Sequence, residues 1–218
     1  MLAAFALSIQ LALLSCLILL VIGVPLAWAL ARKKFAGRRV LEAIFLLPLT
    51  LPPTVLGFYL LMLLGQNGPL ARGLGITWAF RFEGLLLGSV LFSLPFALTA
   101  FREAFRAIDS EFLEVARCYG ASWQQTWLYV ILPLSWPGIF SGSLLAFAHT
   151  LGEFGVVLML GGSIPGQTQT ISIYLYDLAQ SLKFEEANRL AAILLVTSFV
   201  ILFVARTLEE RWRENTGR

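Results

Sequence analysis

The chain has 218 residues, of which 58% are hydrophobic and 13% are charged. A soluble domain is nearer one quarter charged, so most of this chain is expected to face lipid or other apolar helices. At about 20 residues per membrane-spanning helix, the length allows roughly five spans and leaves no room for a soluble catalytic domain. The net charge of +3 sits in short loops beside apolar runs, which is typical of topology signals rather than of a nucleic-acid-binding surface.

The apolar runs predict an all-α integral membrane fold with about five transmembrane helices, in a single domain over residues 1–218. The predicted spans are 5–30, 40–64, 84–101, 137–160 and 187–205. A further segment, 168–182, has apolar residues at helical spacing but is too short and too polar to span a membrane. Two placements are open for it, at the outer interface or dipping between the other helices.

The second predicted span contains Pro48, Pro52 and Pro53. Prolines are tolerated in membrane helices when neighbouring groups satisfy the freed backbone. These three residues therefore either kink a packed helix or break it, so that the backbone lines a pathway or forms a hinge.

Positive charge is distributed unevenly between the two sides of the predicted bundle. Twelve of the 16 Lys and Arg residues lie in three alternate segments, around 32–39, 102–117 and 206–218, and four lie in the intervening ones. Short cytoplasmic segments of membrane proteins carry such an excess. The bias predicts an N-terminus outside the cell and a C-terminus in the cytoplasm.

A polar stretch over residues 106–133 separates the third and fourth predicted spans, on the cytoplasmic side of this topology. Asp109 or Ser110 is placed to cap a first helix, and Gly120 to end it in a left-handed conformation. The capping-box spacing from Ser122 to Gln125 predicts a second helix, which is expected to stop before Pro133.

The first of these helices is predicted to be amphipathic. Phe112, Val115, Ala116 and Tyr119 share one apolar face, while Glu114 and Arg117 share the other at a spacing that permits pairing. From the residues alone two interpretations are open: a helical hairpin lying on the membrane, or a lever on which a partner protein acts.

The polar stretch also carries a recognisable pattern, Glu114-Val-Ala116-x3-Gly120-x9-Val130-Ile-Leu132-Pro133. It resembles the "EAA" loop of permease subunits of bacterial ABC importers, with Val115 in place of the first alanine and Val130 in place of the isoleucine. In that family the loop docks on the ATP-hydrolysing subunit. The resemblance implies a type I importer fold with a cytoplasmic coupling hairpin, and ATPase-coupling roles for Glu114, Ala116, Arg117 and Gly120.

Three further stretches, 31–57, 146–155 and 161–170, are similar to the molybdate/tungstate group of these permeases. This implies a homodimer in the cell inner membrane that forms the pathway for molybdate, with an ABC ATPase and an extracytoplasmic molybdate-binding protein as partners. Sulfate or tungstate as cargo, and a secondary transporter or a membrane scaffold, are the alternatives. Candidate residues of the pathway or gate are Pro52, Pro53, Gly152, Glu153 and Gly155.

Residues of the kinds used in catalysis and metal binding are sparse. His149 is the single histidine, which excludes a multi-histidine metal site, and we expect neither catalysis nor a cofactor in this chain. Related permeases often carry arginine at the position of His149, so a buried structural role and a role in anion passage are both open for it. The stretch Gly161–Thr168 has phosphate-loop spacing, but Gln167 replaces the required lysine, and we interpret the stretch as an outer loop.

Overall fold

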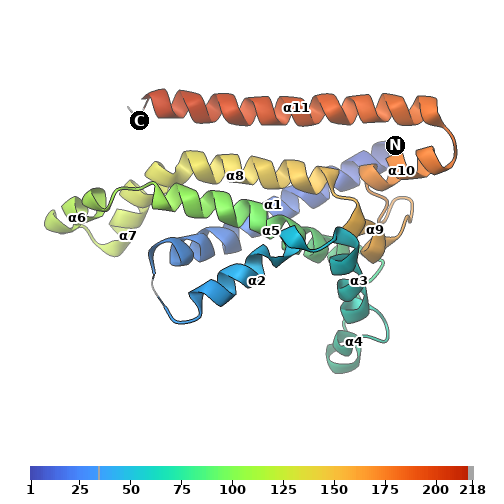
Figure 1. The fold of residues 1–218 in the computed structure, drawn as a ribbon, viewed down its shortest axis with the longest axis horizontal. Helices are drawn as coiled ribbons and strands as arrows, with labels where there is room; N and C mark the ends of the chain where they lie inside the picture. The colour runs from blue at the N-terminus through green and yellow to red at the C-terminus, as the bar shows by residue number, and fades with distance from the viewer. Residues whose placement is uncertain (34, 216–218) are drawn as a thin grey trace.

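The computed structural model describes residues 1–33 and 35–215, and every regular element among them is a helix (Figure 1). Five helical segments of this described part are long and apolar enough to cross a membrane. They are α1 (Leu2–Arg32), α3 with α4 (Pro53–Leu64 and Pro69–Leu74), α5 (Phe82–Arg106), α7 to α8 (Trp123–Gly152) and α11 (Phe184–Asn215). The predicted all-α membrane fold with five spans is confirmed.

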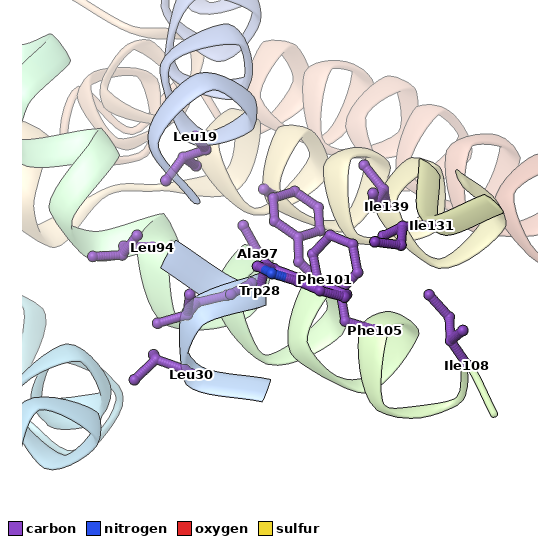
Figure 2. Close-up of a cluster of buried hydrophobic side chains, with 13 residues drawn as sticks. Leu19, Trp28, Leu30, Leu94, Ala97, Phe101, Phe105, Ile108, Ile131 and Ile139 are labelled. Carbon is purple, nitrogen blue, oxygen red and sulfur yellow. The ribbon is translucent and has the colours of Figure 1, made fainter. Parts of the chain in front are cut away.

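The centre of the bundle is formed by α1, α5 and α8, each of which packs against the other two. Figure 2 shows the side chains between them, with Trp28 of α1 beside Phe101 and Phe105 of α5. A Cβ atom added at Gly142 of α8 would lie 2.7 Å from the Cβ of Ala100 on α5. Small residues therefore let these two backbones approach closely, which is a usual way for membrane helices to associate.

The second predicted span, 40–64, is broken at its prolines, which is one of the two alternatives that the sequence left open. The chain forms α2 (Arg38–Thr50), passes through extended residues at Leu51 and Pro52, and begins α3 at Pro53. A residue that precedes a proline disfavours helical geometry, so the chain leaves the helix before Pro52 and Pro53. Proline at the first position of a helix loses no hydrogen bond, so Pro53 can start the next helix. Helix α2 buries none of its residues and lies outside the five spans.

The predicted stop before Pro133 is also wrong. Helix α7 (Trp123–Thr126) continues through a π-helical turn, η1 (Trp127–Ile131), into α8 (Leu132–Gly152). Pro133 lies in the first turn of α8, and the amide of Leu132 bonds back to the carbonyl of Trp127, five residues earlier. The wider π turn lets the helix pass a residue that has no amide hydrogen.

At its other end this helix stops earlier than the predicted boundary of 160. Helix α8 ends at Gly152, Glu153 has extended geometry, and a separate short helix, α9 (Gly155–Gly161), follows. Glycines on both sides of the break lower the helical preference there, because glycine loses more backbone entropy than other residues in a helix.

The amphipathic segment that the sequence left without a placement forms α10 (Ile171–Gln180), which Thr170 caps. Its buried residues Ile171 and Leu178 pack against Ala4 of α1 and Leu190 of α11. Helix α10 therefore joins the N-terminal end of α1 to the start of α11, as Figure 1 shows at the end of the bundle opposite α6.

Candidate functional site

The polar stretch contains α6 (Ser110–Cys118), which projects from the bundle where α5 ends and α7 begins (Figure 1). The Asp109 side chain accepts a hydrogen bond of 3.1 Å from the amide of Glu111, so the predicted N-cap is present. The predicted capping box is confirmed as well: Ser122 and Gln125 exchange hydrogen bonds of 2.8 and 3.3 Å between side chains and amides. These bonds define where both helices start.

Gly120 ends α6 with a φ of +73°, which confirms the predicted left-handed conformation. Its amide donates to the carbonyl of Arg117 at 2.9 Å, and the amide of Ala121 donates to the carbonyl of Ala116 at 3.0 Å. This pair of bonds is a Schellman motif, which satisfies carbonyls that the helix end leaves without partners. An added Cβ at Gly120 would meet nothing within 4 Å, so the backbone angle and not space requires glycine here.

Helix α6 is exposed over most of its surface. No residue of this helix is buried, and Tyr119 is 87% exposed and Val115 48% exposed. Leu113 is a partly buried neighbour of the central hydrophobic cluster. Glu114 and Arg117 are exposed, and among the ion pairs of the described residues none joins them, so the pairing that their spacing permits is not formed.

Aromatic side chains connect the end of this stretch to the bundle. The ring of Trp28 on α1 lies 5.9 Å from that of Trp123 and 5.2 Å from that of Trp127, measured between centroids. Trp28 also meets Phe105 of α5 edge to face at 5.2 Å. Aromatic pairs at these distances are mutually attractive, so α7 and η1 are held to both α1 and α5.

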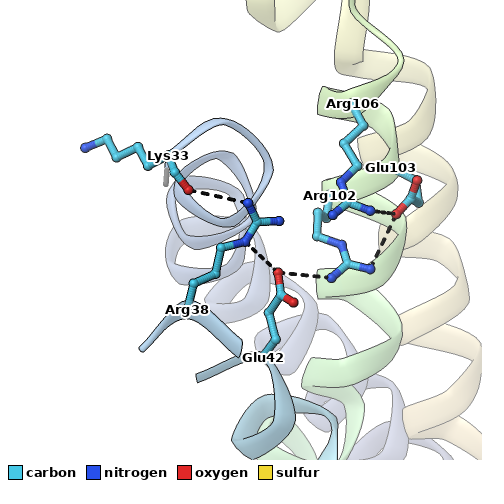
Figure 3. A network of polar contacts seen from close by, with 6 residues as sticks. All are labelled: Lys33, Arg38, Glu42, Arg102, Glu103 and Arg106. Atoms are coloured by element: carbon cyan, nitrogen blue, oxygen red, sulfur yellow. Dashed lines mark hydrogen bonds and ion pairs between the residues drawn. The ribbon is translucent and has the colours of Figure 1, made fainter. Parts of the chain in front are cut away.

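A cluster of charged side chains joins α2 to the end of α5 (Figure 3). Glu42 accepts a hydrogen bond from Arg38 at 2.9 Å and pairs with Arg102 across the two helices at 3.5 Å. Glu103 pairs with both Arg102 and Arg106, at 3.4 and 3.0 Å. The hydrogen bond from Arg38 holds the pKa of the Glu42 carboxyl below its ordinary value. Sequence reasoning missed this cluster, although Glu42 is the only acidic residue of α2.

Two of the predicted pathway residues meet at the helix breaks. A Cβ added at Gly155, the first residue of α9, would lie 2.8 Å from the Cβ of Pro53, the first residue of α3. One turn further on, a Cβ added at Gly57 would lie 2.7 Å from the Cβ of Met159. The glycines thus allow α3 and α9 to pack backbone to backbone. Pro52 precedes this contact in the extended link, whereas a Cβ added at Gly152 would meet nothing within 4 Å.

Glu153 lies between α8 and α9 and is 3% exposed. Its backbone carbonyl accepts a hydrogen bond of 2.5 Å from Ser172, but neither oxygen of its carboxyl group has a hydrogen-bond partner among the described residues. The hydroxyl of Ser89 is likewise buried without a hydrogen-bond partner among the described residues. A carboxylate that is buried without a partner is costly in an apolar environment, so the charged form of Glu153 destabilises this part of the bundle.

His149 is held by α5 and not by Glu153. Its Nδ1 atom lies 3.0 Å from the hydroxyl of Ser93, and its ring lies against those of Phe92 and Phe96, with centroids 4.9 and 4.0 Å away. These contacts fit a packed structural histidine, one of the two roles that the sequence left open.

The family model described as "Binding-protein-dependent transport system inner membrane component" matches residues 4–214. The chain belongs to this family. It is therefore a multi-pass permease of the inner membrane, a transport subunit rather than an enzyme, and its system includes a binding protein and an ABC ATPase.

Several curated relatives match this permease over most of their length. It is 44% identical to the molybdenum transport system permease protein ModB of Azotobacter vinelandii, over 93% of this chain and 91% of that one. It is 36% identical to ModB of Escherichia coli K12, over 99% and 96% of the two chains. A probable sulfate transport system permease, cysT of Marchantia polymorpha, is 30% identical over 95% of this chain and 73% of its own.

The fold of the permease is found in solved transporters. It matches a chain of a bacterial ABC transporter involved in the import of the acidic polysaccharide alginate with a TM-score of 0.77, over 96% of this permease and 79% of that chain. Sequence identity is 19%, so this likeness shows the shared fold alone.

Proposed function

We propose that this permease forms the transmembrane pathway of a molybdate importer. Two copies enclose the path, an ABC ATPase binds from the cytoplasm, and an extracytoplasmic molybdate-binding protein delivers the anion. The cargo is supported by the 44% and 36% identity to proteins described as molybdenum transport permeases. The dimer is supported by α2, which buries no residue within its own chain and so leaves a surface for a second copy.

In this proposal the N-terminus lies outside the cell and the C-terminus in the cytoplasm. The orientation is supported by the excess of Lys and Arg on one side of the predicted topology, with 12 of 16 cations there. It assigns α6 to the cytoplasmic face, where the ATPase is, and the α10 end of the bundle to the face where a binding protein arrives.

The observation that carries the proposal is the exposed part of α6, where Val115 is 48% and Tyr119 87% exposed. A helix with Val115 and Tyr119 exposed, and with Glu114 and Arg117 beside them, is suited to binding in a groove of a partner. Ala116 adds only a small side chain near the end of the helix. Gly120 ends the helix in the left-handed conformation. A movement of α6 is passed to the bundle through Leu113 and through the tryptophan contacts of α7 and η1.

The gate is assigned to the two helix breaks. The link at Pro52 and Pro53 and the link at Gly152–Gly155 lie next to each other through the close contact between Pro53 and Gly155. Irregular backbone at membrane depth is tolerated where protein surrounds it or where it lines a water-filled cavity. A dianion requires such a hydrated path, because each uncompensated charge in hydrocarbon costs several kcal/mol. Glu153 would repel molybdate, so we assign it to opening and closing rather than to anion contact.

Uptake of labelled molybdate at nanomolar concentration tests the proposal, in cells without this gene and in cells in which it is restored. We expect uptake to depend on the gene, to be blocked by tungstate, and to resist excess sulfate. Sulfate is the second candidate cargo, because a probable sulfate permease shares 30% identity with this chain. Uptake that sulfate readily blocks would assign the permease to sulfate, and uptake without the gene would contradict a role in molybdate import.

A further inference from the structure

A groove with a volume of about 840 Å³ runs between the last turns of α1 and the segment formed by α7 and η1. Its lining includes Pro25, Trp28 and Lys33 on one side and Trp123, Trp127 and Leu128 on the other. The groove is outside the α6 face to which the ATPase is assigned and outside the contact between Pro53 and Gly155. The transport function proposed above uses the tryptophan contacts in the wall of the groove but assigns no molecule to the groove itself.

The walls of the groove are apolar and fixed in position. Trp28 stands edge to face against Trp127, with an angle of 88° between the rings, and tilts by 51° against Trp123. The contact of Trp28 with Phe105 fixes this aromatic group to the buried core of the bundle. Tryptophan is enriched at the boundary between lipid tails and headgroups, where its ring fits both environments.

The depth of the groove indicates which kind of molecule can occupy it. Helix α1 is a membrane span that ends at Arg32, so Lys33 marks the membrane surface. Pro25 lies eight residues earlier, which at 1.5 Å per residue is about 12 Å further into the bilayer. Helix α1 has 31 residues, about 46 Å at this rise, and a bilayer with its headgroups is about 40–45 Å thick around a hydrocarbon layer of about 30 Å. The groove therefore crosses the headgroup layer and reaches the edge of the hydrocarbon. A lipid occupies both layers at once, with its headgroup in the first and its acyl chain in the second.

The charge at the mouth of the groove selects the headgroup. Lys33 is exposed there, and none of the residues that line the groove is acidic. The neighbouring Arg32 is already engaged: it donates to the carbonyls of Phe105, at 2.9 Å, and Ile108, and its guanidinium lies 5.7 Å from the ring of Trp28. Among the described residues that line the groove, Lys33 is thus the cation that can meet a phosphate. In the proposed orientation it faces the cytoplasmic leaflet, where anionic lipids attract basic residues.

We propose that this groove binds one anionic phospholipid of the bilayer. An acyl chain lies along Trp28, Trp127 and Leu128, and the headgroup phosphate pairs with Lys33. The bound lipid bridges α1 and the helix that follows α6, so it stabilises the attachment of the coupling region to the bundle.

The test measures lipid binding to the purified complex of the permease with its ATPase, by native mass spectrometry in detergent with added phosphatidylglycerol or phosphatidylcholine. For Lys33→Gln we expect about fivefold weaker binding of phosphatidylglycerol, since one basic residue near a membrane surface contributes about that factor. The loss for phosphatidylcholine should be smaller, because its own choline cation already offsets the charge of its phosphate. For Trp123→Ala we expect weaker binding of both lipids. Lys33 is exposed, so its replacement leaves the fold intact.

Two variants serve as matched controls. Arg39→Gln removes an exposed cation close to Lys33 in sequence but outside the groove, and Trp136→Ala removes a half-exposed tryptophan that does not line it. Both are expected to bind lipid as the unmodified complex does. Equal phosphatidylglycerol binding by the Lys33→Gln and Arg39→Gln variants would overturn the proposal.

A second measurement checks for a different occupant. Leu128→Cys, in a background in which Cys16 and Cys118 are replaced by serine, is treated with a short cross-linking reagent in native membranes. A cross-link to the ATPase or to a second copy of the chain would show that protein covers the groove and would contradict lipid binding. Neither measurement depends on uptake, so a wrong cargo assignment would leave its result unchanged.

Discussion

Gly155 at the start of α9 packs on Pro53 at the start of α3 so closely that a Cβ at position 155 would lie 2.8 Å from the proline Cβ. Non-bonded carbon atoms require about 3.5–4.0 Å, so a side chain here displaces one helix from the other. The two helix breaks are therefore dependent on each other: a change of position at one must be accommodated at the other.

Replacing Gly155 by leucine is expected to abolish most transport, because the side chain forces α9 away from α3. We expect uptake to fall at least tenfold. We also expect the free energy of unfolding to fall by about 1–3 kcal/mol, which is typical of overpacking. Gly73→Leu is the matched control, since a Cβ added at Gly73 meets nothing within 4 Å. Normal uptake by a well-expressed Gly155→Leu variant would mean that the contact has no part in the pathway.

Replacing Gly120 by valine is expected to uncouple ATP hydrolysis from uptake. The φ of +73° is unfavourable for a β-branched residue, at a cost of about 1–2 kcal/mol, so the end of α6 unwinds or changes direction. Uptake and ATP hydrolysis are measured on the reconstituted transporter. Gly120→Asn, which tolerates left-handed geometry, should retain most coupling. Full coupling in the valine variant would remove α6 from its proposed role.

Glu42→Gln is expected to loosen α2 from α5, because it removes the charge that pairs with Arg38 and Arg102. The pairs are partly exposed, so we expect a loss of less than about 1 kcal/mol in stability. The thermal midpoint of the purified permease measures it. Glu185→Gln, whose pair with Arg189 is far more exposed, should change the midpoint less. An equal change in both variants would contradict a specific role of the cluster.

The same carboxyl group predicts a dependence on pH. Its pKa in the folded protein is below the ordinary value of 4.5. Its contribution to stability is therefore present above pH 4.5 and is lost as the pH falls through the lowered pKa. The difference in thermal midpoint between the unmodified protein and the Glu42→Gln variant should accordingly shrink as the pH is lowered below 4.5. A difference that stays constant down to the lowest usable pH would show that the charge of Glu42 is not what stabilises the contact.

Glu153→Gln is expected to keep or raise the stability of the permease. The substitution preserves the shape of a buried side chain whose two carboxyl oxygens have no hydrogen-bond partner in the described part of the chain, and it removes the possibility of a buried charge. Asp177→Asn provides the contrast, because that carboxylate accepts hydrogen bonds from Ser163 and Gln169 at 2.5 and 2.8 Å, and should lose stability. Thermal unfolding measures both. A clearly destabilised Glu153→Gln variant would show that the carboxyl group makes a stabilising interaction.

The sequence by itself determined the features whose causes lie within a few neighbouring residues. The lengths of the apolar runs were enough for the five-span helical fold, because a helix must be apolar over about 20 residues to cross a membrane. The caps at Asp109 and Ser122 and the stop at Gly120 were predictable because each hydrogen bond closes over two to five residues. For the same reason the start and the end of α6 could be predicted before its position in the fold was known.

Only the tertiary structure decided which distant residues meet. The contact of Pro53 with Gly155, the pairing of Glu42 with Arg102 and the burial of Glu153 each depend on how separate helices pack. The sequence left open whether the prolines of 40–64 kink a helix or break it, and it predicted a stop before Pro133 that was wrong. A proline removes one hydrogen bond in either place, but whether the chain breaks there or passes through a π turn depends on the packing of the flanking helices, to which local sequence contributes little.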